Sequence, residues 1–149
     1  MHIYLGGSDI SHSSDASWRN ELTSMISTSL FPSTPNYDLD LTSQAYRTEI
    51  RSLNSIKVHC FTPKPFSLLA ITDLLEDAHT CPKSTIFILL DHDGCKTWGD
   101  DHSFKELVAI GKLVKELGCH VFFHLDAAAE FVNSIVKEKK YNKLKANKS

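Results

Sequence analysis

Residues 85–91 read Thr-Ile-Phe-Ile-Leu-Leu-Asp, a continuous apolar run that stops abruptly at Asp91. A strand with one face in water alternates polar and apolar residues, whereas an uninterrupted run with β-branched residues is typical of a strand covered on both faces. Such strands occur almost only in parallel sheets that carry helices on both sides. The run therefore predicts a central parallel strand over residues 85–90 and an α/β fold.

The segments on either side of this run alternate between strand and helix patterns. Strand patterns cover residues 2–5, 56–61 and 119–124, and helix patterns cover 18–30, 42–54, 67–79, 103–117 and 127–139. Residues 31–41, with two prolines, read as a loop, and 141–149 as a frayed polar tail. The alternation predicts a three-layer flavodoxin-like or Rossmann-like sandwich with a mostly parallel sheet of four or five strands. We expect one domain over 1–140, followed by the tail.

The composition narrows the class of protein. The chain has 149 residues and a formal net charge of −2, without a basic face before the tail, so we expect no nucleic-acid polymer as partner. No apolar run is long enough to cross a membrane, and the first residues turn polar too soon for a signal peptide. Four cysteines without CxxC spacing indicate buried thiols in a reducing compartment. We therefore expect a cytoplasmic protein.

Four segments should meet at the carboxyl edge of the parallel sheet, where ligands of such folds bind. They are residues 6–8, 62–65, 91–101 and 125–126. In the first of them, Gly6 and Gly7 allow a backbone to approach a ligand, and Ser8 has a hydroxyl for a phosphate or sugar. A plain tight turn explains these three residues equally well.

The segment after the central strand is rich in carboxylates. Asp91 directly follows the strand, and Asp100 and Asp101 precede a helix whose first turn contains Glu106. One interpretation is helix capping and a favourable charge at the positive end of the helix dipole. The other is a catalytic site in which Glu106 attacks an electrophilic carbon and a neighbouring aspartate orients it or moves a proton.

Other groups in this segment carry weaker signals. His92 and His102 are candidate acids or bases, and Trp98 is either a packing residue or part of a lid over a ligand. A metal site built from residues 91–93 and His102 lacks any recognised ligand spacing, so we expect no metal. Cys95 has no base placed for it by spacing and is not expected to be a nucleophile.

Several motifs together resemble the nucleoside 2-deoxyribosyltransferases and the related deoxynucleoside-monophosphate N-glycosidases. The first strand reads Ile-Tyr-Leu-Gly-Gly over residues 3–7 and is followed by Ser8, and the second strand pattern runs into Thr62-Pro63. Residues 100–106 read Asp-Asp-His-Ser-Phe-Lys-Glu and are similar to the Asp-Asp-Gly-Ser-Ala-Phe-Glu pattern of the family. The resemblance covers about residues 2–125.

The resemblance implies roles for particular residues. It makes Glu106 the nucleophile that attacks the anomeric carbon, with Asp100 and Asp73 as catalytic helpers. The substrate-binding residues that we expect are Tyr4, Gly6, Gly7, Ser8, Asp91, Trp98 and His102. It implies no cofactor and a small-molecule nucleoside or nucleotide as partner. It also implies a homo-oligomer, since the binding sites of the family are closed across subunits.

The resulting expectation is an enzyme that cleaves or transfers at the N-glycosidic bond of a nucleoside or nucleotide. Two alternatives stay open. The chain departs from the family pattern at His102 and Val108, where the family has glycines, which favours a non-catalytic nucleotide-binding or sensor module. A structural or partner-binding α/β domain, whose acidic segment is only a solvated loop, is the third interpretation.

Overall fold

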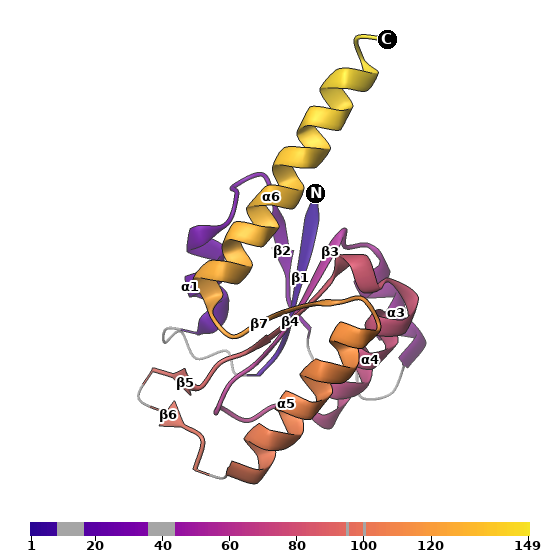
Figure 1. Cartoon of the computed structure of the whole chain (residues 1–149). Helices are drawn as coiled ribbons and strands as arrows, with labels where there is room; N and C mark the ends of the chain where they lie inside the picture. The colour runs from indigo at the N-terminus through magenta and orange to yellow at the C-terminus, as the bar shows by residue number, and fades with distance from the viewer. Residues whose placement is uncertain (9–16, 36–43, 95, 100) are drawn as a thin grey trace.

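A five-stranded parallel sheet forms the centre of the computed structural model, which describes residues 1–8, 17–35, 44–94, 96–99 and 101–149 (Figure 1). The sheet order is β2-β1-β3-β4-β7, and each pair of neighbours is parallel. The strands are β1 (His2–Gly7), β2 (Phe31–Ser33), β3 (Ile56–Phe61), β4 (Thr85–Leu89) and β7 (His120–Phe122). The α/β class and the parallel sheet predicted from the sequence are confirmed.

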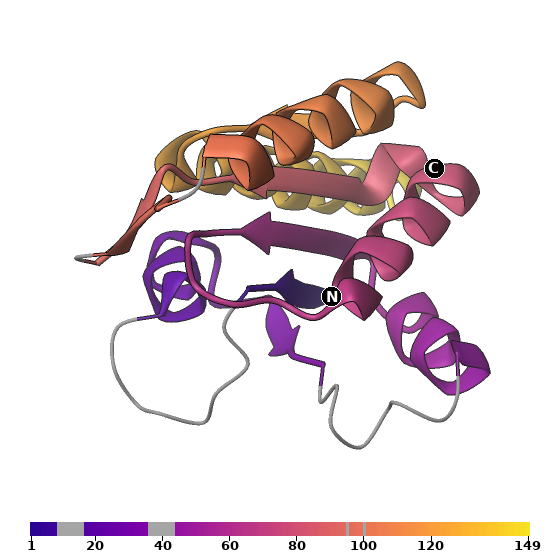
Figure 2. The ribbon, with the colours of Figure 1, turned by 90° about the horizontal axis from the view of Figure 1, so that it is seen from below.

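Helices cover both faces of this sheet (Figure 2). On one face lie α1 (Trp18–Met25) and α6 (Leu125–Ala146), and on the other α4 (Leu68–Thr80) and α5 (Asp101–Glu116). Helix α3 (Gln44–Ser52) lies beside α4 (Figures 1 and 2). The described residues also include a 3₁₀ turn, η1 (Pro82–Ser84), and a hairpin of β5 (His92–Asp93) and β6 (Lys96–Thr97).

Strand β4 is buried on both faces, as its apolar run predicts. Ile86 and Ile88 pack with α1 and α6, whereas Phe87 and Leu89 pack with α4 and α5, and all four side chains are almost completely inaccessible. Burying side chains of this size contributes about 1.5–3 kcal/mol each. The central strand therefore joins two apolar cores, one on each side of the sheet.

The edge strand β2 falls inside residues 31–41, which were predicted to be a loop. The prediction was wrong for residues 31–33, and residues 36–41 lie outside the described part of the chain. The three residues of β2 include Pro32, which has no backbone N–H to donate, but β2 pairs only with β1 and needs hydrogen bonds on one side alone. A proline is tolerated in such an edge strand. The preceding helix α1 is correspondingly shorter than predicted and ends at Met25.

The C-terminal segment also differs from the prediction. Helix α6 begins at Leu125 and continues to Ala146, so the expected frayed tail from residue 141 is helical and the expected domain boundary at 140 falls inside a helix. Its end projects away from the sheet (Figure 1). Lysine, leucine and alanine are good helix formers, which explains how an exposed extension remains helical.

The ends of two helices follow their sequence signals. Ser67 caps α4 by accepting a hydrogen bond from the Leu69 N–H at 3.1 Å. After α5, Gly118 adopts a positive φ of 106°, and the N–H of Cys119 donates to the carbonyl of Val114. This is the glycine-terminated end that the sequence predicts.

Of the cysteines, Cys60 and Cys119 are buried and Cys81 is half-buried, while Cys95 lies outside the described residues. Burial raises the pKa of Cys60 well above its usual value and that of Cys119 to about 11. Within the described ranges, no helix has the length and apolarity needed to span a membrane.

Candidate functional site

The switch point of this topology, where a ligand is favoured, lies between the carboxyl ends of β1 and β3. From β1 the chain passes to β2 on one side, whereas β3, β4 and β7 follow on the other. Ligands of open α/β sheets bind at such a switch point, beyond the ends of the strands. Here β1 ends in Gly7 followed by Ser8, and β3 is followed by Thr62.

Gly7 has no space for a side chain. Its φ is 116°, and a Cβ built on it would lie 1.9 Å from the carbonyl oxygen of Cys60 on β3. Directly afterwards, the Ser8 N–H donates to the same carbonyl at 2.8 Å. The glycine therefore lets the end of β1 lie flat against β3, which is the tight-turn interpretation of this motif.

Ser8 links the two strand ends through its side chain. It is fully buried, its Oγ accepts a hydrogen bond from the Thr62 N–H at 2.9 Å, and the same hydroxyl is 3.3 Å from the Thr62 carbonyl, to which it donates. In this arrangement the hydroxyl joins the ends of β1 and β3. A phosphate or sugar would have to replace the hydrogen bonds with Thr62.

The loops after β3 and β4 are joined at the same edge, as the sequence predicts. Thr62 Oγ1 donates to Asp93 Oδ2 at 2.9 Å, and Lys64 Nζ lies 3.6 Å from Asp93 Oδ1. Trp98 donates from Nε1 to the Leu90 carbonyl at 2.9 Å and packs on Phe104. The Trp98 side chain is thus a packing residue of the loop, and it also borders a separate hollow beside residues 63–66.

Asp91 lies in a different part of this edge. It is exposed and forms an ion pair with His92 at 2.5 Å, which lowers the pKa of Asp91 and raises that of His92. Both line a cavity of about 440 Å³ that also contains His124 and Asp126, from the start of α6. The predicted meeting of the Asp91 and Asp126 segments is therefore confirmed.

A buried ion cluster lies between the sheet and helices α3 and α4. We give this name to Arg47, Arg51, His59, Asp73 and Asp77, none of which is more than 6% exposed. Asp73 Oδ1 lies 3.2 Å from Arg47 Nε and 3.0 Å from Arg51 Nη1. Asp77 accepts from Arg51 Nε at 3.1 Å and contacts His59 Nε2 at 2.8 Å. Charges this deeply buried are stable only when paired.

The two aspartates of the cluster have opposite pKa shifts. Burial raises the pKa of Asp73 above its usual value, and the nearby guanidinium groups of Arg51 and Arg47 offset only part of that rise. Burial acts in the same direction on Asp77, but the hydrogen bond with His59 and the charge of Arg51 outweigh it and lower the Asp77 pKa. Asp73 Oδ2 and His59 Nδ1 are buried atoms without a hydrogen-bond partner.

Tyr4 connects the ion cluster to the glycine turn. Its ring lies beside Gly6, where a Cβ would come within 2.6 Å of Tyr4 Cε1, and the ring centroid is 5.7 Å from that of His59. A contact path therefore runs from Gly6 through Tyr4 and His59 to Asp77. The predicted residues Tyr4, Gly6 and Asp73 belong to one neighbourhood.

Helix α3 is attached to α4 mainly by polar groups. Besides the cluster, Glu76 on α4 accepts hydrogen bonds from Thr48 Oγ1 at 2.6 Å and Gln44 Nε2 at 2.9 Å, and it lies 3.3 Å from Arg51 Nη2. Burial raises the pKa of Glu76, but these two hydrogen bonds outweigh that effect and lower it. The carboxylates of α4 thus provide polar contacts that attach α3 to α4.

The structure does not bring Glu106 and His102 into this neighbourhood. The two form an exposed ion pair of 2.9 Å along α5, with their side chains 64% and 78% exposed. Asp100, the remaining predicted catalytic residue, lies outside the described residues. The roles given to Glu106, His102 and Asp100 therefore stay predictions without a described cavity around them.

Sequence reasoning missed Arg47, Arg51, His59 and Asp77. A signal was present, because Arg47 and Arg51, like Asp73 and Asp77, are four residues apart and therefore share one face of a helix. Asp73 and Asp77 also directly precede Leu74 and Ala78, respectively, which belong to the apolar face of α4. As for metals, the parts of the chain that the structure describes contain no group of three or more suitable ligands.

The opposite pKa shifts of Asp73 and Asp77 predict how the stability of the protein depends on pH. Because the pKa of Asp77 is lowered on folding from 3.8, its ionised form stabilises the protein above that pH, and this contribution disappears as pH falls through the folded pKa. The raised pKa of Asp73 has the opposite effect. Its protonated form favours folding at low pH, and this contribution disappears as the pH rises through the folded pKa. We expect Asp77→Asn to lower the free energy of unfolding by about 3 kcal/mol near neutral pH. This loss relative to the wild type should become smaller towards pH 2.

Urea unfolding of both proteins between pH 7 and pH 2 measures this difference. Glu49→Gln on the exposed side of α3 is the control, and its difference from the wild type should be small at every pH. A penalty for Asp77→Asn that is independent of pH would contradict the ionised state assigned to Asp77.

Comparisons of this chain with protein-family models, with curated proteins and with solved structures found no match.

Proposed function

We propose that the protein cleaves or transfers at the N-glycosidic bond of a nucleoside or nucleotide. One observation carries the proposal: Gly6, Tyr4 and Asp73, which the family resemblance selects from two separate segments, β1 and α4, lie around one buried polar neighbourhood next to the switch point between β1 and β3. A glycosidic bond breaks through a cationic, oxocarbenium-like transition state, which carboxylates stabilise.

The reacting carboxylate that the geometry favours is Asp73. Its Oδ2 is buried without a hydrogen-bond partner, so the lone pairs of this oxygen are not engaged, which suits a nucleophile. Asp73 Oδ2 would form a bond to the anomeric carbon while the carbon–nitrogen bond breaks, and the departing base would take a proton from water. Water or a second base would then attack the same carbon, the ester bond to Asp73 would break, and the proton of the attacking group would pass to solvent. Glu106, which the resemblance makes the nucleophile, is the second candidate.

A specific observation also favours the non-catalytic alternative. Asp73 Oδ1 is shared between Arg47 and Arg51, and its side chain is only 1% exposed, so that a substrate reaches it only if α3 shifts. A protein that binds a nucleotide at the switch point without reacting would keep these ion pairs intact. This alternative predicts binding without release of the base.

The test is incubation of the protein with a panel of deoxynucleosides and their monophosphates, with and without a free acceptor base, followed by chromatography of the released base. We expect Asp73→Asn to reduce release by at least about a hundredfold, as loss of a nucleophile does, and Glu106→Gln to leave it nearly unchanged. Circular dichroism of each variant shows whether it is folded.

The possible results separate the proposals. Loss of activity in Glu106→Gln but not in Asp73→Asn would transfer the role of nucleophile to Glu106. Absence of base release, together with a rise in melting temperature with one of the nucleotides, would establish the binding module. Neither release nor a thermal shift with any compound would contradict both functions.

A further inference from the structure

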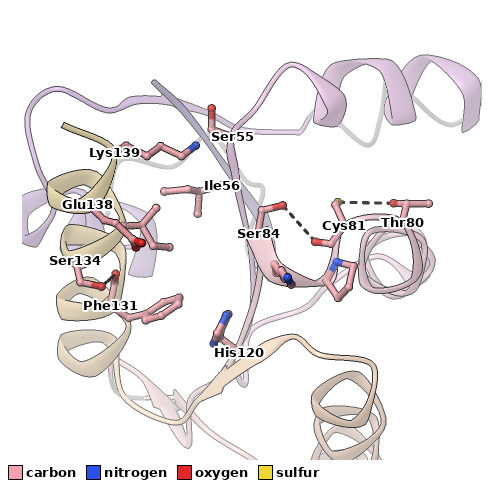
Figure 3. Close-up of a pocket in the computed structure, with 13 residues that line it drawn as sticks. Ser55, Ile56, Thr80, Cys81, Ser84, His120, Phe131, Ser134, Glu138 and Lys139 are labelled. Atoms are coloured by element: carbon pink, nitrogen blue, oxygen red, sulfur yellow. Dashed lines mark hydrogen bonds between the residues drawn. The ribbon is translucent and has the colours of Figure 1, made fainter. Parts of the chain in front are cut away.

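A second cavity lies at the opposite, amino-terminal edge of the sheet (Figure 3). It has a volume of about 620 Å³, within the range of sites for small organic ligands. Its walls are the middle of α6, the end of α4 with η1, and the residues at the starts of β3 and β7. None of the residues discussed for the switch point between β1 and β3 contributes to it, so its role is separate from the proposed reaction.

An aromatic pair forms one side of this cavity. The rings of His120 and Phe131 are 4.2 Å apart between centroids, and Phe122 lies behind Phe131 at 5.5 Å. Both His120 and Phe131 are only partly buried, so their rings are accessible from the cavity. Ile56 and Ile135 add aliphatic surface around them. This wall suits a flat, unsaturated ring, which gains from stacking as well as from burial.

Positive charge borders the same space. Lys139 extends from α6 towards Ser55 (Figure 3), and Lys83, which belongs to η1, also lines the cavity. Among the described residues, neither lysine has an ion-pair partner within 4.0 Å, and Glu138 is the only carboxylate that lines the cavity. Residues 137–149 carry six lysines and one glutamate, which adds a positive potential over this edge.

From this combination we infer that the cavity is a binding site for a small aromatic anion, a flat ring system that carries a carboxylate, sulfonate or phosphate group. The ring lies against Phe131 and His120, and the acidic group pairs with Lys139. An apolar or cationic ligand would leave the lysines unpaired, and an aliphatic anion would leave the aromatic wall in water. The charge and the shape of the cavity thus select the same class of ligand.

The probe for this inference is anilinonaphthalene sulfonate, a fluorescent aromatic anion, titrated into the full-length protein in its folded state. Lys139→Glu replaces the attractive charge by a repulsive one and should weaken binding about tenfold. The matched control is Lys140→Glu, the same change on the adjacent residue of α6, which does not line the cavity and should change the affinity less than about twofold.

Two further measurements test the position and the ligand class. Ser134→Trp places a large side chain in the cavity from an exposed position on α6 and should abolish binding, while the circular dichroism spectrum stays unchanged. The neutral analogue phenylnaphthylamine should lose affinity in Ser134→Trp but not in Lys139→Glu. Equal effects of Lys139→Glu and Lys140→Glu, undiminished binding to Ser134→Trp, or no binding to the wild type would each overturn the inference.

Discussion

Replacing Gly7 by alanine should destabilise the protein by more than about 3 kcal/mol, which is at the upper end of the effects of single substitutions. The new Cβ would lie 1.9 Å from the Cys60 carbonyl oxygen and 2.7 Å from its carbon, both backbone atoms of β3 that cannot move without disrupting the pairing of β1 with β3. The positive φ of 116° adds a separate backbone cost. Urea unfolding followed by circular dichroism measures the loss.

Gly94→Ala is the matched control for this prediction. Gly94 also has a positive φ, of 62°, but a Cβ there would meet no atom within 4 Å. It should therefore show the backbone cost alone, about 1–2 kcal/mol. Similar losses for the two variants would show that the close approach of β1 to β3 at Gly7 is not what requires the glycine.

Replacing Arg51 by methionine is the second change with a large expected effect. It should lower the free energy of unfolding by about 3–5 kcal/mol. Methionine retains much of the aliphatic volume but removes the charge that is shared by Asp73 and Asp77, so that both carboxylates lose a partner in a buried position. The contact of Arg51 with Glu76 is lost as well, which weakens the attachment of α3 to α4. The free energy of unfolding near pH 7 is the measurement.

Lys112→Met on the exposed side of α5 provides the control, because the same type of substitution there should have an effect within about 0.5 kcal/mol. Combining Arg51→Met with Asp77→Asn should cost less than the sum of the single variants, since the double variant no longer buries an unpaired charge at Asp77. Strict additivity would mean that Arg51 and Asp77 do not stabilise each other.

Local sequence patterns were informative wherever one element's own residues decide its structure. Strand β3 has the predicted bounds, and β4 is one residue shorter than predicted. The glycine after α5 also ends the helix as expected. By contrast, β2 is three residues long and contains a proline, so its own sequence carries little strand signal, and pairing with β1 defines it.

The candidate site was predicted less well than the fold, for a similar reason. The sequence drew attention to the carboxylates after β4, because they are close together along the chain, yet Asp91 and Glu106 are both exposed in the folded protein. Asp73 was selected only by the family resemblance. No role was assigned from the sequence to its partners Arg47 and Arg51.

The sequence by itself determined the parallel α/β architecture, its central strand and the glycine turn at the carboxyl edge, because hydrophobic periodicity and backbone freedom are properties of neighbouring residues. Only the tertiary structure decided which charges are buried. Arg47 meets Asp73, and Arg51 meets Asp77, across 26 positions of the chain. These pairs form only when α3 and α4 lie side by side, so their burial, and the pKa shifts that follow from it, depend on packing between elements rather than on any local pattern.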